Sequence, residues 1–482
     1  MVLRLYNSMG RKVSVFRPLR GRTVKMYTCG PTVYNYAHIG NFRTFVFEDV
    51  LRRYLKYSGY RVVQVKNITD VEDRIIEGIK RTGMTREALT AKFTDAFMED
   101  LDSLYIVRAE HYPRATEFVG DIVKAVKSLM RKGYAYKADD ESIYFSIKKF
   151  RRYGALSGIK QKELKAGTRV SMDHYDKAGA NDFALWKAWD EADGAVFWET
   201  EIGKGRPGWH IECSVMAMKF LGPSLDIHTG GKDLRFPHHE NEIAQSEALT
   251  GKKFVRYWLH SEFLNIKGEK MSKSLGNLIT LRDLLKDSWS ARAVRLFLIS
   301  AHYRDELNLT DGSMAQASAT IEKIDEFHAK VSAGLARGAA GTASAAKQPV
   351  ASLLRDFARA MDDDLNTPKA IAAFFEFQRK VNKLMDSGLL SRADCDLVSG
   401  AMKRVDDVLG IMQYWAPANG GHAQAELQAS EDEMGLVRER EEARNLKDYA
   451  RADAIREKLR ARGLVVEDTP GGPVLRKLST VA

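Results

Sequence analysis

An alternation of strand-like and helix-like segments near the start of the chain most constrains its fold. Residues 24–27 form a short apolar run typical of a buried strand, and Gly30 and Pro31 follow it. Helical periodicity then runs from 41 to 57, and 61–66 form a second strand before another helical pattern. This order predicts an α/β fold with a doubly wound parallel sheet. Ligands of such sheets bind beyond the carboxyl ends of the strands.

Length and charge limit what the chain can be. Its 482 residues predict two to four domains, and its net charge of +11 favours a polyanionic partner such as nucleic acid. A basic surface kept for solubility explains the charge equally well. Three cysteines form no disulfide framework, which predicts a reducing, cytoplasmic compartment with thiols free to bind metal. Neither a signal peptide nor a membrane-spanning run is expected.

The pattern changes several times along the chain. Strand and helix signals are regular at first, become irregular and rich in aromatic residues, resume near 225, and give way to helices after 308. A low-complexity stretch, 334–349, is expected to be a loop, and a hairpin is expected around 469–472. We expect a Rossmann-type catalytic domain in two halves, 1–112 and 213–312, with an insertion between them at 113–212. A helical bundle is expected at 313–415, and a linker with a small C-terminal module at 416–482.

The segment from His38 to Asn41 (HIGN) opens the first expected helix. Free backbone N–H groups and the helix dipole favour phosphate at such a position. Gly40 would let a nucleotide approach closely, and His38 and Asn41 can donate hydrogen bonds to phosphate oxygens. The motif is short, however, and a capped helix start alone would explain it.

A second segment, Lys270 to Ser274 (KMSKS), is far more specific. Lys270 and Lys273 on one short loop can neutralise the charge that builds on the α-phosphate and pyrophosphate in a transition state. The two segments, in this order around a split α/β domain, resemble the arrangement of class I aminoacyl-tRNA synthetases.

Four residues far apart in sequence predict one zinc site: Cys29, Cys213, His238 and Glu242. His238 and Glu242 are four residues apart, so they share one face of a helix. Zinc prefers sulfur and nitrogen ligands, and the small molecule that such a site selects is a thiol. Taken singly, a cysteine is more often a small core residue, and a histidine and a glutamate at helical spacing are more often a surface pair. His239 and Glu240 compete for the ligand roles, and spacing alone does not exclude them.

Four segments closely resemble the cysteinyl-tRNA synthetase family: 27–34 (YTCGPTVY), 67–70 (NITD), 208–213 (GWHIEC) and 236–242 (FPHHENE). The resemblance, which runs almost from end to end, implies that Cys29, Cys213, His238 and Glu242 hold a zinc that takes the substrate thiolate. It also implies that Thr69 and Trp209 line the amino-acid pocket, that Asp233 holds the ribose of ATP, and that Lys273 is the main ATP contact of the second loop.

The same resemblance implies the reaction and its partners. The protein would activate L-cysteine with ATP and transfer it to the terminal adenosine of tRNA(Cys). The phosphoryl chemistry implies Mg²⁺ with the ATP, and a monomer is the default expectation. Two positions depart from the family pattern. Asn41 stands where many members carry histidine, and residues 71–77 lack the usual lysines, which puts in doubt the persulfide-forming activity linked to them.

The C-terminal part is expected to bind tRNA. Residues 313–415 fit an anticodon-binding bundle, and the resemblance places Arg444, Tyr449, Asp453 and Asp468 where anticodon contacts are made. Arginine can contact base edges or phosphate, tyrosine can stack on a base, and aspartate can accept from an exocyclic amine. A charged amphipathic helix with a solvated face would account for the same composition.

Two other functions remain open at this level. A cysteine ligase of the mycothiol pathway resembles the catalytic domain but lacks the C-terminal module. A catalytically silent paralogue would bind tRNA only, although the complete set of zinc ligands and Lys273 argue against it.

Overall fold

The computed structural model divides into two compact units, Met1–Trp415 and Ala416–Ala482. It describes most of the chain, and every structural statement below concerns these residues. They are 2–159, 182–271, 276–287, 289–337, 341–412, 431–445, 464–469 and 472–477, with the single residues 448, 451, 452, 454, 455, 458 and 459.

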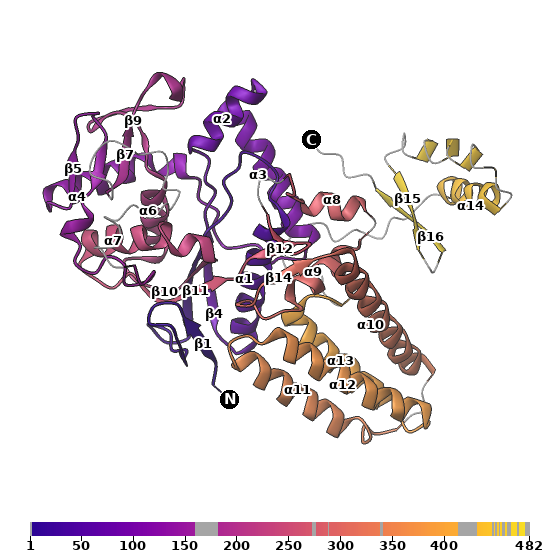
Figure 1. Ribbon diagram of the computed structural model, residues 1–482. Coiled ribbons are helices and arrows are strands. Elements are labelled where there is room, and N and C mark those ends of the chain that lie inside the picture. The colour runs from indigo at the N-terminus through magenta and orange to yellow at the C-terminus, as the bar shows by residue number, and fades with distance from the viewer. Residues whose placement is uncertain are drawn as a thin grey trace. The chain divides into compact units, whose positions relative to one another are not determined.

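A four-stranded parallel sheet lies at the centre of the first unit (Figure 1). In the order β11-β10-β3-β4, its strands are Val255–Ser261, Leu225–Gly231, Thr23–Thr28 and Arg61–Lys66. Helix α1 (Ile39–Tyr57) joins β3 to β4. The strands are largely buried, as expected for a parallel sheet covered on both faces. The predicted α/β fold with a parallel sheet is confirmed.

The strand order reverses at β3. The chain passes from β3 through α1 to β4 on one side, whereas β10, from much later in the sequence, pairs with β3 on the other. Ile227 lies opposite Met26, and Thr229 lies opposite Thr28. The carboxyl ends of β3 and β10 are therefore adjacent, and such a switch point is where ligands bind in open α/β sheets.

Further elements complete the two halves around this sheet. They are β1 (Arg4–Asn7), β2 (Lys12–Val15), α2 (Asp73–Thr82), α3 (Arg86–Ser103), α6 (Trp209–Leu221), η4 (Lys232–Arg235), α7 (His238–Thr250), β12 (Leu264–Ile266), β13 (Glu269–Lys270), α8 (Leu281–Lys286), α9 (Ala291–Ile299) and β14 (Leu307–Leu309). The expected boundary between 212 and 213 lies inside α6, which packs on α7.

The aromatic-rich stretch between the halves is a five-stranded antiparallel sheet. Its strands, in the order β5-β6-β7-β9-β8, are Ala135–Lys137, Ile143–Phe145, Phe183–Ala188, Gly203–Pro207 and Trp198–Thr200. Short 3-10 helices, η1 (Ala115–Phe118), η2 (Ile147–Lys149) and η3 (Glu191–Asp193), and helix α4 (Val119–Arg131) accompany it. The rings of Phe145 and Phe183 stack with centroids 5.0 Å apart, so the aromatic residues form the core of this sheet.

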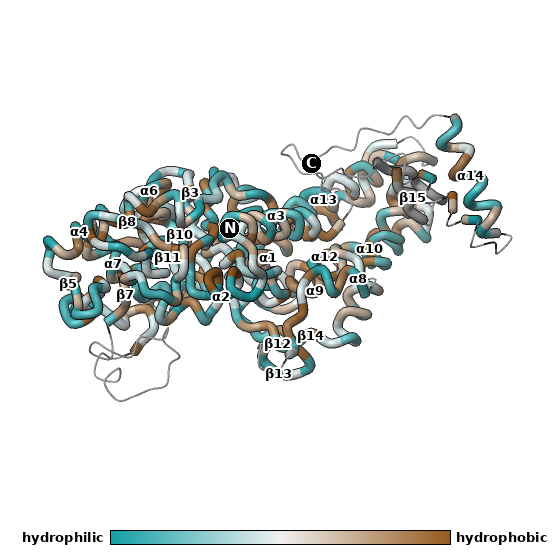
Figure 2. The backbone as a smooth tube through the Cα atoms, turned by 90° about the horizontal axis from the view of Figure 1, so that it is seen from above, coloured by the Kyte–Doolittle hydropathy of each residue, from teal (hydrophilic) through white to brown (hydrophobic). Residues whose placement is uncertain are grey.

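Helices α10 (Asp311–Arg337), α11 (Lys347–Asp362), α12 (Thr367–Asp386) and α13 (Arg392–Leu409) form the bundle. Hydrophobic and hydrophilic residues alternate along them, as expected of helices with one buried face (Figure 2). The bundle is joined to the catalytic halves, because Tyr54 Oη of α1 donates to Asp362 at 2.8 Å and Arg295 Nε of α9 donates to the carbonyl of Leu409 at 2.7 Å.

The prediction of a loop over 334–349 is wrong at both ends. Residues 334–337 belong to α10 and 347–349 to α11. Leu335 and Arg337 are good helix formers, and Pro349 lies in the first turn of α11, where proline is tolerated.

The second unit holds α14 (Glu431–Asn445), β15 (Leu464–Thr469) and β16 (Gly472–Lys477). The two strands pair antiparallel, which confirms the expected hairpin. A small core forms where Val437, Ile455, Leu459 and Leu464 meet. Across the described helices of both units, none combines the length and apolar character needed to cross a bilayer.

Candidate active site

A cleft of about 330 Å³ opens at the carboxyl edge of the parallel sheet. Its walls come from the segments that follow β3, β4 and β10 and from the start of α1. Of the residues that the sequence predicts for catalysis, ATP, cysteine or metal, ten line this cleft: Cys29, His38, Gly40, Asn41, Thr69, Trp209, Cys213, Asp233, His238 and Lys270. Glu242 lies behind it as a fully buried residue.

The start of α1 is held by a reciprocal cap. The backbone N–H of Asn41 donates to Nδ1 of His38 at 3.3 Å, and the backbone N–H of His38 donates to Oδ1 of Asn41 at 3.1 Å. Burial lowers the pKa of His38, and Arg74 adds to this effect while Asp233 opposes it. His38 is therefore neutral at pH 7 and accepts at Nδ1, which leaves Nε2 to donate.

The second loop approaches the first at Gly40. A Cβ atom at Gly40 would lie 2.3 Å from Cε of Met271, so a larger residue here would require the end of the Met271 side chain to move. Beyond the loop, the N–H of Ile39 donates to the carbonyl of Ile279 at 2.8 Å. Lys270 in β13 is exposed, with its Nζ 4.3 Å from the centroid of the Phe263 ring. Lys273 lies outside the described residues.

Asp233, Thr69 and Trp209 surround the rest of the cleft. Asp233 lies in η4, directly after β10. Thr69 follows β4, and its hydroxyl accepts from Asn67 Nδ2 at 3.1 Å. Trp209 begins α6, and its ring centroid is 4.4 Å from that of His238. The indole therefore lies directly against one of the predicted metal ligands.

The four residues predicted to bind metal meet at one point. One donor atom from each of Cys29, Cys213, His238 and Glu242 lies within 4.8 Å of the others, and all four residues are buried. His238 Nε2 is 3.1 Å from Oε1 of Glu242, because the two residues are one helical turn apart on α7. Two thiols, an imidazole and a carboxylate are the donor types that zinc takes. The set fits a metal ion.

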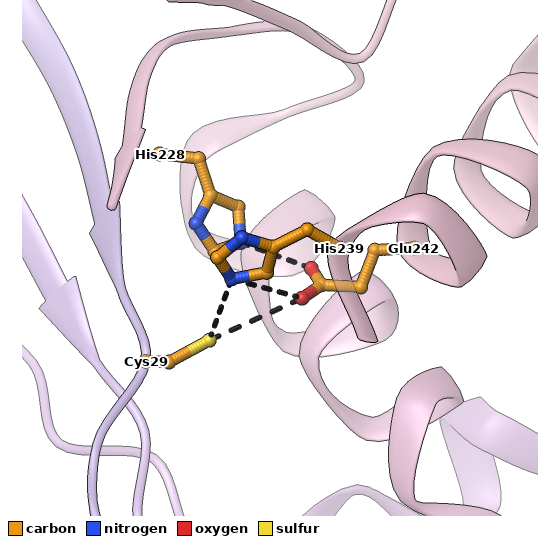
Figure 3. A group of neighbouring side chains, drawn as sticks. All are labelled: Cys29, His228, His239 and Glu242. Carbon is orange, nitrogen blue, oxygen red and sulfur yellow. Dashed lines mark hydrogen bonds and ion pairs between the residues drawn. The ribbon is translucent and has the colours of Figure 1, made fainter. Parts of the chain in front are cut away.

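A second set of donors shares two of these residues (Figure 3). His228 of β10 and His239 of α7 join Cys29 and Glu242, again with donor atoms within 4.8 Å. His228 Nε2 is 3.0 Å from Oε2 of Glu242, and His239 Nε2 is 3.4 Å from Sγ of Cys29. Oε2 of Glu242 thus faces His228, whereas Oε1 lies near both His238, at 3.1 Å, and His239, at 4.0 Å.

Charge stabilises these groups despite their burial. Burial alone would lower the pKa of His238, but Cys213 and Glu242 raise it to about 10. A hydrogen bond from Cys29 and the charge of His238 lower the pKa of the Cys213 thiol, whereas burial raises that of Cys29. Burial and neighbouring imidazoles keep the pKa of His239 well below its usual range, so its ring is neutral. The first set therefore carries compensating charges before any ion binds.

The sequence left His239 and Glu240 as rival ligands, and the structure separates them. Both oxygens of Glu240 accept backbone N–H groups of the insertion, from Gly154 at 2.8 Å, Leu156 at 3.1 Å and Ser157 at 2.8 Å. Tyr153 donates to Oδ1 of the adjacent Asn241 at 2.5 Å. Glu240 therefore anchors the insertion, and among the two rivals only His239 belongs to a donor set.

Sequence analysis missed three histidines in or beside these sets. His210 Nδ1 is 2.9 Å from Nδ1 of His238, His228 contacts Glu242, and His260 Nε2 is 2.8 Å from Nδ1 of His239. His228 lies in the strand expected near 225, whereas His260 lies in β11, a strand that the sequence analysis did not predict. The available signal was a polar ring inside a buried strand, which requires a partner.

The residues expected to contact the anticodon are only partly described. Arg444 lies in α14, with Nη1 3.7 Å from the carboxylate of Glu441. Asp468 lies in β15, where its backbone is opposite Pro473. Tyr449 and Asp453 are outside the described residues.

Three family models match the chain in succession. Residues 15–319 match the model for the catalytic domain of class I (C) tRNA synthetases, 356–413 match the DALR domain, and 428–473 match the cysteinyl-tRNA ligase anticodon binding domain. The parallel sheet and the two loops at its edge are thus those of a class I aminoacyl-tRNA synthetase.

Curated relatives match over nearly the whole length. The chain is 45% identical over 477 residues to a cysteine–tRNA ligase of Chlamydia pneumoniae, covering 99% of this chain and 98% of that protein. It is 42% identical over 478 residues to the cysteine–tRNA ligase of Protochlamydia amoebophila, with 98% of both covered. The chain belongs to the cysteinyl-tRNA synthetase family.

Solved structures share the fold at much lower identity. A Mycobacterium tuberculosis methionyl-tRNA synthetase in complex with methionyl-adenylate aligns with a TM-score of 0.62 at 15% identity, covering 81% of this chain and 92% of that one. A leucyl enzyme, the Agrobacterium radiobacter agnB2 LeuRS in a ternary complex, aligns with a TM-score of 0.59 at 11% identity over 82% and 85%.

Proposed function

We propose that this chain activates L-cysteine with ATP and transfers it to tRNA(Cys). One observation carries the proposal: a buried donor set with two thiols opens into the same cleft as two nucleotide loops. Family membership supports the same reaction, since the full-length relatives are cysteine–tRNA ligases.

The metal in this proposal is one Zn²⁺, held by Cys29, Cys213, His238 and Glu242. When bound, it supplies a Lewis acid that takes the thiolate of the substrate. Serine has nearly the volume of cysteine, so a pocket that relies on shape separates the two poorly. A site built around a specific bond to the substrate can discriminate by about 10⁴-fold or more, because the un-ionised hydroxyl cannot replace that bond.

At the other end of the cleft, protein groups hold ATP. His38 Nε2 donates to phosphate oxygens at the positive end of the α1 dipole, and Lys270 neutralises charge on the leaving pyrophosphate. Asp233 accepts from the ribose hydroxyls. Oδ1 of Asn41 caps α1 by accepting from the backbone N–H of His38, and a histidine at this position would have no amide oxygen for this contact. Mg²⁺ accompanies the nucleotide, and Lys273, outside the described residues, is the proposed second cation.

In the reaction itself, the residues position groups and stabilise charge. A carboxylate oxygen of cysteine attacks the α-phosphorus of ATP in line, the bond to the bridging oxygen breaks, and pyrophosphate leaves. Thr69 and Trp209 hold the amino acid. A hydroxyl of the terminal adenosine of tRNA then attacks the carbonyl carbon, and AMP leaves. No protein nucleophile is needed.

The remaining parts are proposed to bind tRNA. Residues 313–415 form the bundle, and 416–482 carry Arg444, Tyr449, Asp453 and Asp468 toward the anticodon. The match to an anticodon binding domain over 428–473 supports this division of roles. It also distinguishes the chain from a mycothiol-pathway ligase, which has no such module. We further propose that the protein acts as a monomer in the cytoplasm.

Cysteine-dependent exchange of pyrophosphate into ATP tests the proposal. We expect exchange with cysteine, at least about 10⁴-fold less with serine, and loss of exchange after the metal is removed by a chelator. Charging of tRNA(Cys) should follow. Exchange without charging, but with ligation of cysteine to an amino-sugar, would indicate the mycothiol-type reaction. Binding of tRNA without exchange would indicate a silent paralogue.

A further inference from the structure

Tyr36 lies at the rim of the cleft, two residues before His38, and has no role in the proposed reaction. Its side chain lines the cleft and is 38% exposed, although it is large and aromatic. The surrounding residues suggest a binding surface, because several contacts fix the ring in place.

Two groups hold the ring of Tyr36. The ring of Phe93 on α3 meets it edge to face, with centroids 5.2 Å apart and planes at 88°. The guanidinium carbon of Arg282 lies 5.0 Å from the centroid of the Tyr36 ring. An aromatic ring covered by a cation and packed on a second ring is pre-organised, so a ligand that stacks on it meets little loss of side-chain entropy.

Arg282 is itself fixed by three contacts to α3. Its Nη2 is 2.6 Å from the carboxylate of Glu99 and 3.0 Å from the carbonyl of Ala96, and its Nε donates to Asp100 at 2.9 Å. Because its donors are used on α3, the guanidinium keeps its position over Tyr36.

These contacts connect Tyr36, which precedes the first nucleotide loop, with the helix that follows the second. Arg282 belongs to α8, which begins shortly after the second loop, and Thr280 pairs by a β-bridge with His38 at the start of α1. Arg74, which is exposed and also lines the cleft, lies over the ring of Tyr34 at 5.7 Å. The rim thus combines aromatic rings with cations, the combination that binds single-stranded nucleic acid and nucleotides.

We propose that Tyr36 is a stacking platform for an adenine base. This inference rests on the proposed function, which brings two adenines to the cleft: that of ATP and that of the 3′-terminal adenosine of tRNA. Both offer the same planar ring, and Arg74 supplies a cation for the attached phosphates. Stacking of one base on an aromatic side chain contributes about tenfold to affinity.

Two substitutions separate the ring from its hydroxyl. Tyr36→Phe keeps the ring and its contacts with Phe93 and Arg282, so we expect nearly unchanged kinetics. Tyr36→Ala should weaken binding of the stacked adenine about tenfold. A rise in the KM for ATP in pyrophosphate exchange identifies ATP as the source. Unchanged exchange with weaker tRNA binding or slower transfer identifies the tRNA end.

A base-free ligand excludes a merely structural effect. If Tyr36 stacks on the tRNA end, Tyr36→Ala should weaken the binding of intact tRNA. It should not weaken the binding of tRNA whose terminal nucleotide is abasic. If it stacks on ATP, ribose triphosphate without a base should bind both proteins alike. Equal loss with and without the base, equal loss in Tyr36→Phe, or no loss in Tyr36→Ala would overturn the inference. Equilibrium binding of ATP and tRNA needs no turnover, so it tests Tyr36 even if wild-type protein shows no exchange.

Discussion

The two donor sets around Glu242 differ in their access to the cleft. In the first set, Cys213 and His238 line the cleft. In the second, His228 and His239 are fully buried and contribute nothing to the cleft wall. Cys29 and Glu242 belong to both sets. The same six side chains thus present one open arrangement and one closed arrangement.

This difference suggests a division of labour. A metal ion that takes a substrate needs an open coordination position, which only the first set offers. The imidazoles of the second set form hydrogen bonds with protein groups instead. His228 bonds to Glu242, and His239 bonds to His260, which in turn bonds to the hydroxyl of Ser8. Such contacts orient metal ligands and usually change metal affinity 10- to 100-fold when removed. Five substitutions test this interpretation.

The largest effect is expected at Glu242, which serves both sets. Glu242→Gln removes the anionic ligand and leaves two buried imidazoles without it. Metal content after dialysis should fall from about one ion per chain to nearly none, with at least about a 100-fold loss of cysteine-dependent exchange. Elemental analysis measures the first quantity. Glu247→Gln on the same helix is the control, because Glu247 belongs to neither donor set. Full metal content in Glu242→Gln would remove the carboxylate from the site.

The next substitutions rank the sets against each other. Cys213→Ser takes a thiolate ligand from the open set, so we expect a loss of metal affinity above about 100-fold. His228→Gln takes an imidazole from the closed set and should cost about tenfold. Competition with a chelator gives both affinities. The reverse order would place the ion among the buried histidines and contradict the open site.

A fourth substitution, Glu240→Gln, changes a residue of α7 that belongs to neither donor set. Glu240→Gln removes a charge that accepts three backbone N–H groups and leaves an NH₂ group facing donors. We expect the free energy of unfolding to fall by about 2 to 3 kcal/mol. Denaturant titration measures this, with metal content close to wild type. Metal loss as large as in Cys213→Ser would show that the insertion positions the ligands.

The smallest effect is expected at the end of the histidine chain. The hydroxyl of Ser8 is 2.7 Å from Nδ1 of His260. Ser8→Ala leaves a buried imidazole nitrogen without this partner, which should cost about 1 to 2 kcal/mol of stability. Thermal unfolding measures the loss, and Ser8→Thr, which keeps a hydroxyl, should recover part of it. A large fall in metal affinity in Ser8→Ala would instead show that the closed set controls the open one.

Local periodicity accounts for what the sequence could predict. Helix α1 begins at Ile39 and α7 at His238, close to the predicted positions, because capping residues and proline mark such starts. The strands around Val62 and Ile227 are short segments that contain valine, leucine or isoleucine. Since parallel strands end at one edge of a sheet, the meeting of Cys29 with β10 follows from the fold class.

Long-range pairing accounts for what the sequence could not predict. The antiparallel sheet of the insertion joins strands of three residues, such as β5 and β6, to β7 much later in the chain. Runs this short have no readable period. His238 and His239 are adjacent on one helix, so spacing cannot say which faces the cleft. That depends on where β10 and β11 place His228 and His260.

Because β10 pairs with β3, the site is sensitive to insertions and deletions in one region of the chain, β10 and the start of α7. Side chains alternate along a strand, so deleting one residue from β10 would exchange His228 for its neighbour and turn the donor away. One residue lost from the start of α7 would rotate the remaining ligands by about 100°. The exposed turn at 139–141 carries no such penalty. Natural or engineered insertions and deletions should therefore accumulate at that turn and be absent between Leu225 and Glu242.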